Sequence, residues 1–420
     1  MSCKRKIPLG ENVLDAAQKR IEWLFDTFEQ KRIEWLFDTF EQITLSFSGG
    51  KDSTVLFHLV AAEARRRHRK FNVMFLDWEV QYSATISHVA AMKSLYADCT
   101  QRFYWIALPV TTESGISQYE PAWTAWEPGK KWVRQPPEDA ITDPDFFPFY
   151  HPGIIFEDFT PSFNQWITGD HHSSVILLGI RADESLNRFL AISNNRKLRY
   201  ADDIPWTTAS PEGFYYMGYP IYDWHVKDIW TYISRSRLPY NTIYDLMHQA
   251  GVSLSKMRIC EPFGPEQRRG LWLYHVLEPE TWSLACARVS GADAGMLYTL
   301  PGNKAGFFGS RQISKPAGHT WKSYARFLLA SLPEKTAEHY RNKIAVYLHW
   351  YAERDYPDGI PDEQSGDTGS KDIPSWRRIC KTLLRNDFWC RSLAFSPTKS
   401  HCYDKYCRRI QAKRKDWQLI

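Results

Sequence analysis

Residues 43–56, ITLSFSGGKDSTVL, constrain the fold of this chain more than any other stretch. Apolar residues at alternate positions (Ile43, Leu45 and Phe47) predict a buried strand, and the apolar-periodic run after Lys51 predicts a helix. Only small residues separate the two elements. A strand, a glycine loop and a helix in this order direct several backbone N–H groups and the positive end of the helix dipole toward one point. Phosphate is the natural ligand at such a point.

We call residues 48–53, SGGKDS, the phosphate loop. Its glycines let the backbone approach a ligand where a Cβ would collide, the nearby hydroxyls can donate to phosphate oxygens, and the lysine would face negative charge. The alternative is an ordinary helix start with a serine cap. The predicted nucleotide-binding residues here are Ser46, Ser48, Gly49, Gly50, Lys51, Asp52 and Ser53, of which Lys51 and Asp52 are also catalytic candidates.

Further buried strands are predicted at 72–76, 103–108 and 175–179, with helices at 53–67 and 86–96 between them. Because ligands of a parallel sheet lie beyond the carboxyl ends of its strands, residues that follow these strands are expected beside the phosphate loop. Asp77 and Glu79, after the second strand, are candidates to hold a metal ion or a ribose hydroxyl, and Trp78 to stack on a base. The alternative is a strand-end turn with solvated carboxylates.

The fourth strand ends in Gly179 and continues into Ile180-Arg181-Ala182-Asp183-Glu184. Planar guanidinium groups at this edge suit phosphate or sulfate. The predicted nucleotide-binding residues of this segment are Gly179, Arg181, Glu184 and Arg188, with Arg181 also as a catalytic candidate. The alternative is that the acidic residues cap the helix and pair with the arginines.

A segment rich in Trp, Pro and Phe, at about 120–165, shows neither helical nor strand periodicity. It is too aromatic to be disordered and too long for a connector, so we expect an ordered insertion near the mouth of the site. Basic residues interleaved with tryptophans could bind a polyanion or stack on bases, although a packed insertion explains them equally well. These residues are Trp126, Lys130, Lys131, Trp132 and Arg134.

Composition limits the partners and the compartment. The formal net charge of +5 over 420 residues is too small to require nucleic acid as a partner, although binding to it remains possible. No run of about 18 apolar residues is present, and the first residues lack the apolar stretch of a signal peptide. We therefore expect a cytoplasmic protein that does not contact membranes. Eight cysteines without a C-x-x-C pair are expected to be free thiols.

The first 42 residues contain a tandem repeat, because KRIEWLFDTFEQ at 19–30 recurs unchanged at 31–42. Each copy has helical periodicity. Twelve residues turn a helix by about 120° beyond three whole turns, so one continuous helix would direct the two apolar stripes differently. Only one copy is expected to pack against the strand that begins at Ile43, and a recent duplication is favoured over a functional repeat.

Helical periodicity dominates from residue 270 onward, and we expect a mainly helical domain at 266–420, after an N-terminal helical segment at 1–42 and a nucleotide-binding domain at 43–265. The predicted fold class is α/β, a parallel twisted sheet with helices on both faces, followed by the helical domain. The C-terminal cysteines match no familiar metal-binding spacing, so no metal ligands are predicted there. They are Cys380, Cys390, Cys402 and Cys407.

Four blocks in order, SFSGGKDS, FLDWE, LLGIRADESLNR and YPIYDWHVKDIWTYI with PYNTIYDL, resemble the 3′-phosphoadenosine-5′-phosphosulfate (PAPS) reductases and PP-loop ATP pyrophosphatases. The blocks CEPFGPEQRRGLWLYH, ISKPAGHTWKSYARFLL and DIPSWRRICKTLLRND extend a resemblance to immunoglobulin-binding regulator A (IbrA) proteins of bacteria and prophages. The resemblance implies an adenine nucleotide α-hydrolase-like fold, with Arg181 on the phosphate or sulfate side of the nucleotide.

The departures from these families are as informative as the matches. The C-terminal Glu-Cys-Gly-Leu-His segment of the reductases has no counterpart here. The Cys-Cys pair and the Cys-x-x-Cys motif of the iron–sulfur members are also missing, because Cys260-Glu261-Pro262-Phe263 stands at the aligned position. Nucleotide binding is therefore expected, whereas attack of a thiolate on sulfate and an iron–sulfur cluster are not.

Two hypotheses of function follow. The first is an enzyme that binds ATP or a PAPS-like nucleotide with Mg²⁺ and cleaves or transfers at the α-phosphate, in sulfur transfer or nucleic-acid modification. The second is a nucleotide-sensing regulator of gene expression that acts with a ParB-like partner, as the resemblance to IbrA implies. Retention of the whole phosphate loop favours the enzyme, and lack of the catalytic cysteine favours the sensor.

Overall fold

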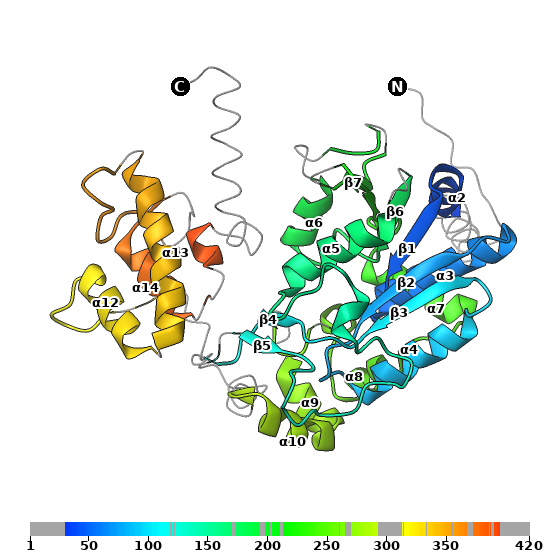
Figure 1. Ribbon diagram of the computed structural model, residues 1–420, viewed down its shortest axis with the longest axis horizontal. Coiled ribbons are helices and arrows are strands. Elements are labelled where there is room, and N and C mark those ends of the chain that lie inside the picture. The colour runs from blue at the N-terminus through cyan, green and yellow to red at the C-terminus, as the bar shows by residue number, and fades with distance from the viewer. Residues whose placement is uncertain are drawn as a thin grey trace, which may run out of the picture.

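The computed structural model describes residues 30–117, 120, 122–169, 173–193, 198–201, 204–210, 213–259, 261–264, 270–292, 313, 315–332, 334–353, 356–367, 373–385, 387 and 390–394. An α/β body occupies one side of the molecule and a group of helices the other (Figure 1). All of the first copy of the repeat except Gln30, and the C-terminal cysteines Cys402 and Cys407, lie outside the described residues. The helix α2 (Gln30–Thr39) consists of Gln30 and most of the second copy, which leads directly into the first strand.

The α/β body is built on a six-stranded sheet with the strand order β3-β2-β1-β6-β8-β7. Five of these strands are parallel, and β7 alone is antiparallel to its neighbour β8. The strands are β1 (Gln42–Ser46), β2 (Phe71–Leu76), β3 (Thr100–Ile106), β6 (Ser174–Leu178), β7 (Thr207–Ala209) and β8 (Tyr216–Gly218). The predicted α/β class with a parallel sheet is confirmed.

Alternate side chains of the strands enter two separate cores, one on each face of the sheet. In β2, Val73 and Phe75 pack with one core, whereas Met74 and Leu76 pack with the other. The helices α2, α3 (Lys51–Arg66), α4 (Ser83–Leu95) and α7 (Val226–Ser236) cover the first face. The second face is covered by α5 (Phe156–Thr168) and the aromatic insertion (Figure 1). The predicted helices on both faces are therefore confirmed.

The aromatic insertion is ordered and packs into the second core. It begins with the antiparallel pair β4 (Thr111–Glu113) and β5 (Ala122–Thr124), continues through a 3-10 turn at Pro144–Phe146, and ends in α5. Trp126, Phe147, Phe159 and Phe163 are all buried. The expectation that the whole segment lacks periodic structure was wrong at α5, where burial of two phenylalanines favours a helix although Pro161 lies inside it.

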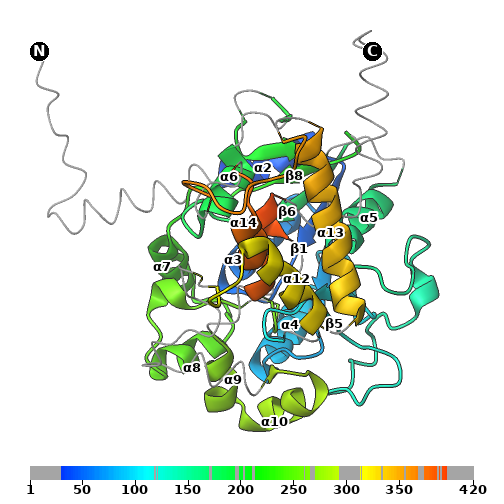
Figure 2. The ribbon, with the colours of Figure 1, turned by 90° about the vertical axis from the view of Figure 1, so that its left-hand side faces the viewer.

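The remaining helices divide between the α/β body and a core of their own. After α6 (Leu186–Ser193) and α8 (Ile243–Gln249), α9 (Leu271–Leu277) and α10 (Pro279–Arg288) pack into the second core of the α/β body. In contrast, α12 (Trp321–Ser331), α13 (Glu334–Ala352) and α14 (Trp376–Leu384) share a third core. Figure 2 shows these three helices in front of the sheet. The additional helical region is as predicted, and the predicted boundary at residue 266 stays a prediction.

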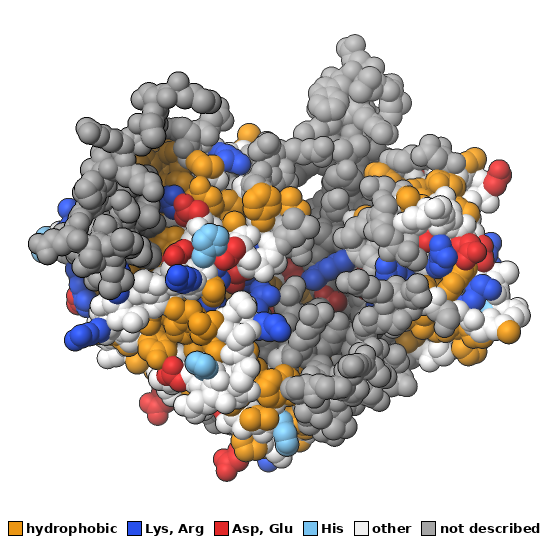
Figure 3. Space-filling view, turned by 180° about the vertical axis from the view of Figure 1, so that it is seen from behind, with side chains coloured by type: hydrophobic (Ala, Val, Ile, Leu, Met, Phe, Trp, Pro, Cys, Tyr) orange, Lys and Arg blue, Asp and Glu red, His pale blue; other side chains and the backbone are white. Residues whose placement is uncertain are grey.

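Among the described residues of the face seen in Figure 3, basic and acidic side chains lie side by side rather than in large regions of one sign. This mixture fits the small net charge of +5. Among the described residues, no helix combines the length and the apolar character needed to cross a membrane.

Candidate functional site

The topology of the sheet creates one site where loops from neighbouring strands diverge. From β1 the chain adds β2 and then β3 on one side, and it later places β6 on the other side of β1. In an open parallel sheet, this change of direction opens a crevice beyond the carboxyl ends of the two strands. The phosphate loop follows β1, and the segment Gly179–Arg181 follows β6. The two segments with the strongest sequence signals therefore meet at the crevice.

The phosphate loop turns sharply and then starts α3. Gly49 has a φ of +72°, a left-handed conformation that favours glycine, and a Cβ there would lie 2.9 Å from Cγ2 of Thr85. The N-cap of α3 is Gly50, which has no side chain to cap the helix. The ordinary serine-capped helix start is therefore not what the structure shows. Asn241 fixes the loop from outside, because its Nδ2 donates to the carbonyl oxygen of Gly49 over 3.0 Å.

Three amide groups of the loop donate to hydroxyl groups. The N–H of Ser48 meets Oγ of Ser53 at 3.3 Å, and that of Gly50 meets Oγ of Ser48 at 3.4 Å. The N–H of Lys51 donates to the hydroxyl of Tyr244 over 3.0 Å. These acceptors are side-chain hydroxyls that can rotate, in contrast to backbone carbonyls fixed in a ladder. The three loop amides are thus capped by hydroxyl groups of the protein, and their predicted convergence on a phosphate stays a prediction.

A chain of buried charges lies beside the loop. Nζ of Lys51 donates to Oδ2 of Asp52 over 2.9 Å, and Nε of Arg181 donates to Oδ1 of the same carboxylate over 2.6 Å. Burial lowers the pKa of Lys51, and the neighbouring Asp52 carboxylate opposes this effect. Arg181 also donates to Asp183. Two cations thus share the loop carboxylate, and the catalytic candidates Lys51, Asp52 and Arg181 are in direct contact.

A cavity of about 60 Å³, which we call the phosphate cavity, is enclosed by the loop and its neighbours. One water molecule needs roughly 10–15 Å³ of such space, so the cavity accommodates a group of phosphate size. Its wall consists of Ser48, Gly50, Lys51, Asp52, Ser53, Gly179, Glu184, Arg188, Tyr244, Arg258 and Ile259. Eight of the predicted nucleotide-binding residues are among them. Ser46 ends β1 just before the loop, and Arg181 contacts the cavity wall through Asp52.

The acidic residues after β6 also pair with the arginines, as the structural alternative expected. Glu184 accepts from Arg188, and one of its oxygens lies 3.9 Å from Nη2 of Arg181. Both members of the first pair line the phosphate cavity. The ion pairs and the placement at the cavity therefore occur together, and the pairing holds the guanidinium groups at the edge of the sheet.

The residues after β2 are used to hold the insertion. Asp77 accepts from Nε1 of Trp105 over 2.8 Å and pairs with Arg134. Glu79, which is fully buried, accepts from the N–H of Trp126 over 2.7 Å and lies 3.2 Å from Nε of Arg288.

Trp78 packs edge-on against Phe156, with ring centroids 5.4 Å apart. It is 7 % exposed. Both carboxylates and this ring are thus occupied within the protein, and their predicted roles toward a nucleotide stay predictions. Among the described residues, no group of three or more His, Cys, Asp or Glu side chains is placed to hold a metal ion.

Three residues of the site were not singled out from the sequence. Tyr244 supplies the acceptor for the Lys51 amide, Asn241 holds the turn at Gly49, and Arg258 lines the phosphate cavity. The first two belong to the block PYNTIYDL, which carried part of the resemblance without an assigned role. Their distance from the loop in sequence, 193 and 192 residues, leaves no local signal for the contact.

Comparison with known proteins identifies two regions. Residues 42–250 match the family model described as the phosphoadenosine phosphosulfate reductase domain. Residues 251–357 and 354–403 match a domain of unknown function (DUF3440). The chain is also similar to the uncharacterized protein YbdN of Escherichia coli (strain K12), with 53 % identity over 415 residues that cover 99 % of this chain and 98 % of that protein.

Solved structures with detectable similarity are more remote. The phosphoadenylyl-sulfate (PAPS) reductase of Candida auris, solved as a phosphate complex, is 12 % identical with a TM-score of 0.30, and the match covers 58 % of this chain and 94 % of that chain. The FMN adenylyltransferase of Candida glabrata, solved with FMN and the ATP analog AMPCPP, is 15 % identical with a TM-score of 0.31, over 57 % of this chain and 63 % of that chain.

Proposed function

Because this chain belongs to the phosphoadenosine phosphosulfate reductase domain family, within the PP-loop proteins of adenine nucleotide α-hydrolase-like fold, we propose that it binds ATP or a PAPS-like nucleotide and cleaves or transfers at the α-phosphate. With ATP, an acceptor atom forms a bond to the α-phosphorus while the bond from that phosphorus to the bridging oxygen breaks. The electron pair of the broken bond leaves with pyrophosphate, which the phosphate loop would hold.

One observation carries the proposal: five residues of the phosphate loop line one phosphate-sized cavity at the topological switch point of the sheet, and Arg181 contacts the cavity wall through Asp52. Preorganised N–H donors and fixed cations stabilise the charge that develops on a leaving pyrophosphate. The donors need little rearrangement to receive an anion, since phosphate oxygens replace the hydroxyls of Ser48, Ser53 and Tyr244 as acceptors.

The charges around the cavity favour a nucleotide that carries a divalent cation. Lys51 and Arg181 are already paired with Asp52, so a polyanion gains less from them than from free cations. Mg²⁺ typically binds through one or two carboxylates, water and substrate phosphates. Asp52 and Glu184 line the cavity, but both carboxylates are already paired with Lys51, Arg181 or Arg188, so binding of Mg²⁺ requires these ion pairs to open and stays a prediction.

Reduction of a sulfonucleotide is not part of the proposal. The described residues that line the phosphate cavity include no cysteine. Burial raises the pKa of Cys99 and raises that of Cys380 to about 12, so neither is a thiolate near neutral pH. Cys260 lies outside the described residues.

Pyrophosphate release from ATP and Mg²⁺ tests the proposal. The variant Lys51→Met removes the charge and keeps much of the side-chain volume, and Lys93→Ala, which removes a partly exposed lysine paired with Asp139, is the matched control. We expect release by the wild type and Lys93→Ala, and its loss in Lys51→Met. Binding of ATP without release would instead favour the nucleotide sensor. No binding of ATP or PAPS would refute the proposal. The ParB-like partner, gene regulation and nucleic-acid modification stay predictions.

A further inference from the structure

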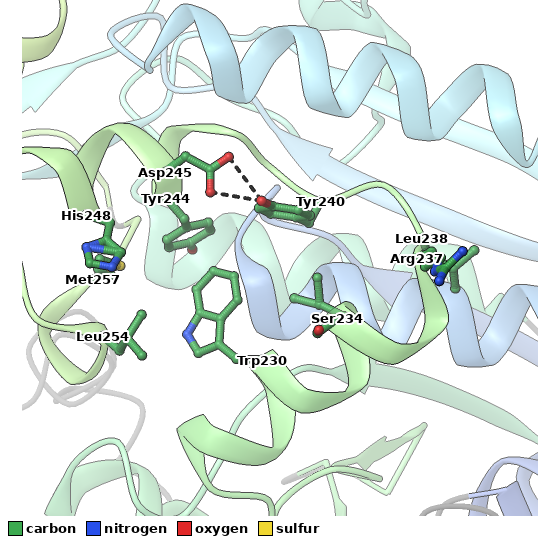
Figure 4. A pocket seen from close by; sticks show the side chains of 11 residues that line it. Trp230, Ser234, Arg237, Leu238, Tyr240, Tyr244, Asp245, His248, Leu254 and Met257 are labelled. Carbon is green, nitrogen blue, oxygen red and sulfur yellow. Dashed lines mark hydrogen bonds between the residues drawn. The ribbon is translucent and has the colours of Figure 1, made fainter.

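A second, larger pocket lies next to the phosphate cavity. Its volume is about 500 Å³, and it is enclosed by the C-terminal half of α7, the start of α8 and the 3-10 turn at Leu254–Lys256. Figure 4 shows that aromatic side chains from two elements form its walls, Trp230 from α7 and Tyr240 and Tyr244 at the start of α8. A volume of this size accommodates a small molecule with several rings or a ring and a sugar.

The two cavities share a wall. Tyr244 lines both of them, and its hydroxyl accepts from the N–H of Lys51 in the phosphate loop over 3.0 Å. Met257, which also lines the large pocket, has its carbonyl oxygen 3.4 Å from Nζ of Lys51. Two residues of the large pocket therefore contact Lys51 of the phosphate loop.

The pocket offers flat surfaces at right angles. The ring of Trp230 meets Tyr240 at an interplanar angle of 88° and Tyr244 at 80°, with centroids 5.9 and 5.5 Å apart. A planar ring that stacks on one of these faces presents its edge to another. Base–aromatic stacking contributes about 1–3 kcal/mol per base and tolerates any base, because every base has a π-face.

Nε1 of Trp230 has no hydrogen-bond partner among the described residues, but it is also closed off from solvent, so Trp230 contributes an apolar wall to the pocket and not a donor. At the rim, Tyr240 donates to the carboxylate of Asp245 over 2.9 Å, and Arg237 is exposed where it could meet a phosphate.

We propose that this pocket binds the nucleobase of the acceptor, so that the acceptor is a nucleotide, either free or as an unpaired base of a polynucleotide. The acceptor role rests on the proposed function, whereas base binding stands on the pocket itself. The base stacks on the aromatic walls of the pocket. The rest of the acceptor passes Tyr244 toward the phosphate loop.

Calorimetric titration tests this inference. The full-length protein is first saturated with α,β-methylene-ATP, so that the nucleotide site is filled, and is then titrated with adenosine, guanosine, cytidine, uridine and a single-stranded hexanucleotide of mixed sequence. Trp230→Phe keeps an aromatic ring but reduces the stacking surface, Ser234→Trp fills the pocket from α7, and Trp166→Phe in α5 is the control. Trp166 is, like Trp230, only partly buried.

We expect binding that Trp230→Phe weakens about 2- to 10-fold, that Ser234→Trp abolishes, and that Trp166→Phe leaves unchanged. Binding of a nucleoside identifies a free nucleotide as the source, and binding of the hexanucleotide alone identifies a polynucleotide; either supports the inference. Absence of binding, or binding that neither pocket variant alters, overturns it. The protein could also fail to bind the ATP analogue and yet bind a nucleoside that Trp230→Phe weakens. That result would support the base site and refute its role in binding the acceptor.

Discussion

Gly179→Ala tests whether the segment after β6 and the phosphate loop form one unit. A Cβ on residue 179 would lie 2.8 Å from the backbone nitrogen of Ser53 and 3.0 Å from the carbonyl carbon of Asp52. Both atoms belong to the backbone of the first turn of α3, so no side-chain rotation relieves the overlap. The two segments must separate by about 0.6 Å to reach an ordinary contact of 3.4 Å.

This separation should lower both the free energy of unfolding and the affinity for the nucleotide. Overpacking a tight contact typically destabilises a protein by about 1–3 kcal/mol, and replacement of glycine returns about 0.4–1 kcal/mol through the unfolded state. The free energy of unfolding should therefore fall by roughly 1–2 kcal/mol. Displacing one or two donors to a charged group costs about 1.5–3 kcal/mol each, which weakens nucleotide affinity by about 10- to 10,000-fold.

Two measurements separate these effects. Calorimetry with α,β-methylene-ATP reports affinity, and urea unfolding reports stability. Gly218→Ala is the matched control, because its Cβ would meet the side-chain end of Leu177 at 3.0 Å in the core of the sheet, away from the loop. We expect it to alter stability at most and to leave affinity unchanged. If Gly179→Ala binds the analogue as tightly as the wild type, the phosphate does not bind beside this contact and the reasoning is wrong.

Three further changes probe other charged groups. Arg288→Ala leaves the buried carboxylate of Glu79 without its cation and should lower the free energy of unfolding by about 3–5 kcal/mol. The control Arg65→Ala removes an exposed arginine and should change this free energy by less than about 1 kcal/mol. Equal losses of the two variants in urea unfolding would contradict this prediction. Burial raises the pKa of Glu261 to about 7, so the folded state holds this proton more tightly than the unfolded state. The free energy of unfolding should therefore fall as the pH rises from about 4.5 to 7. Glu261→Gln should unfold at a higher urea concentration than the wild type at pH 8 but not at pH 4.5. Arg181→Lys cannot reproduce the guanidinium bonds and should weaken nucleotide affinity about 10- to 100-fold in calorimetry; unchanged affinity would remove this residue from the site.

The parallel sheet was predictable because its central strands are long enough to show their periodicity. In β1 the residues Ile43 and Leu45 alternate with polar ones, and β2 is apolar except for Asn72, as is typical of a strand covered on both faces. In contrast, β7 and β8 have three residues each and were not predicted. A segment of that length shows no period, and its pairing depends on the neighbouring strand rather than on its own sequence.

The phosphate site was predictable to the extent that its residues are local to strand ends. The phosphate loop, Gly179 and Arg181 each follow directly from a strand, so the rule for parallel sheets placed them together. Tyr244 in α8 and Asn241 just before that helix contact the loop, and nothing within either segment indicates the contact. The sequence therefore defined the strand-end half of the site and left the opposite wall undefined.

The carboxylates after β2 show why position at the sheet edge does not decide function. Asp77 and Asp52 both lie at the carboxyl end of a strand, and both bind arginine. The partner of Asp77 is Arg134 in the insertion, 57 residues away, so the pair fixes the insertion to the sheet. The partner of Asp52 is Arg181 in the segment after β6, so that pair holds a cation beside the phosphate cavity. The role of such a carboxylate, in the scaffold or in the site, thus depends on which distant element supplies its cation. That element is determined by the tertiary packing and cannot be identified from the residues around the carboxylate.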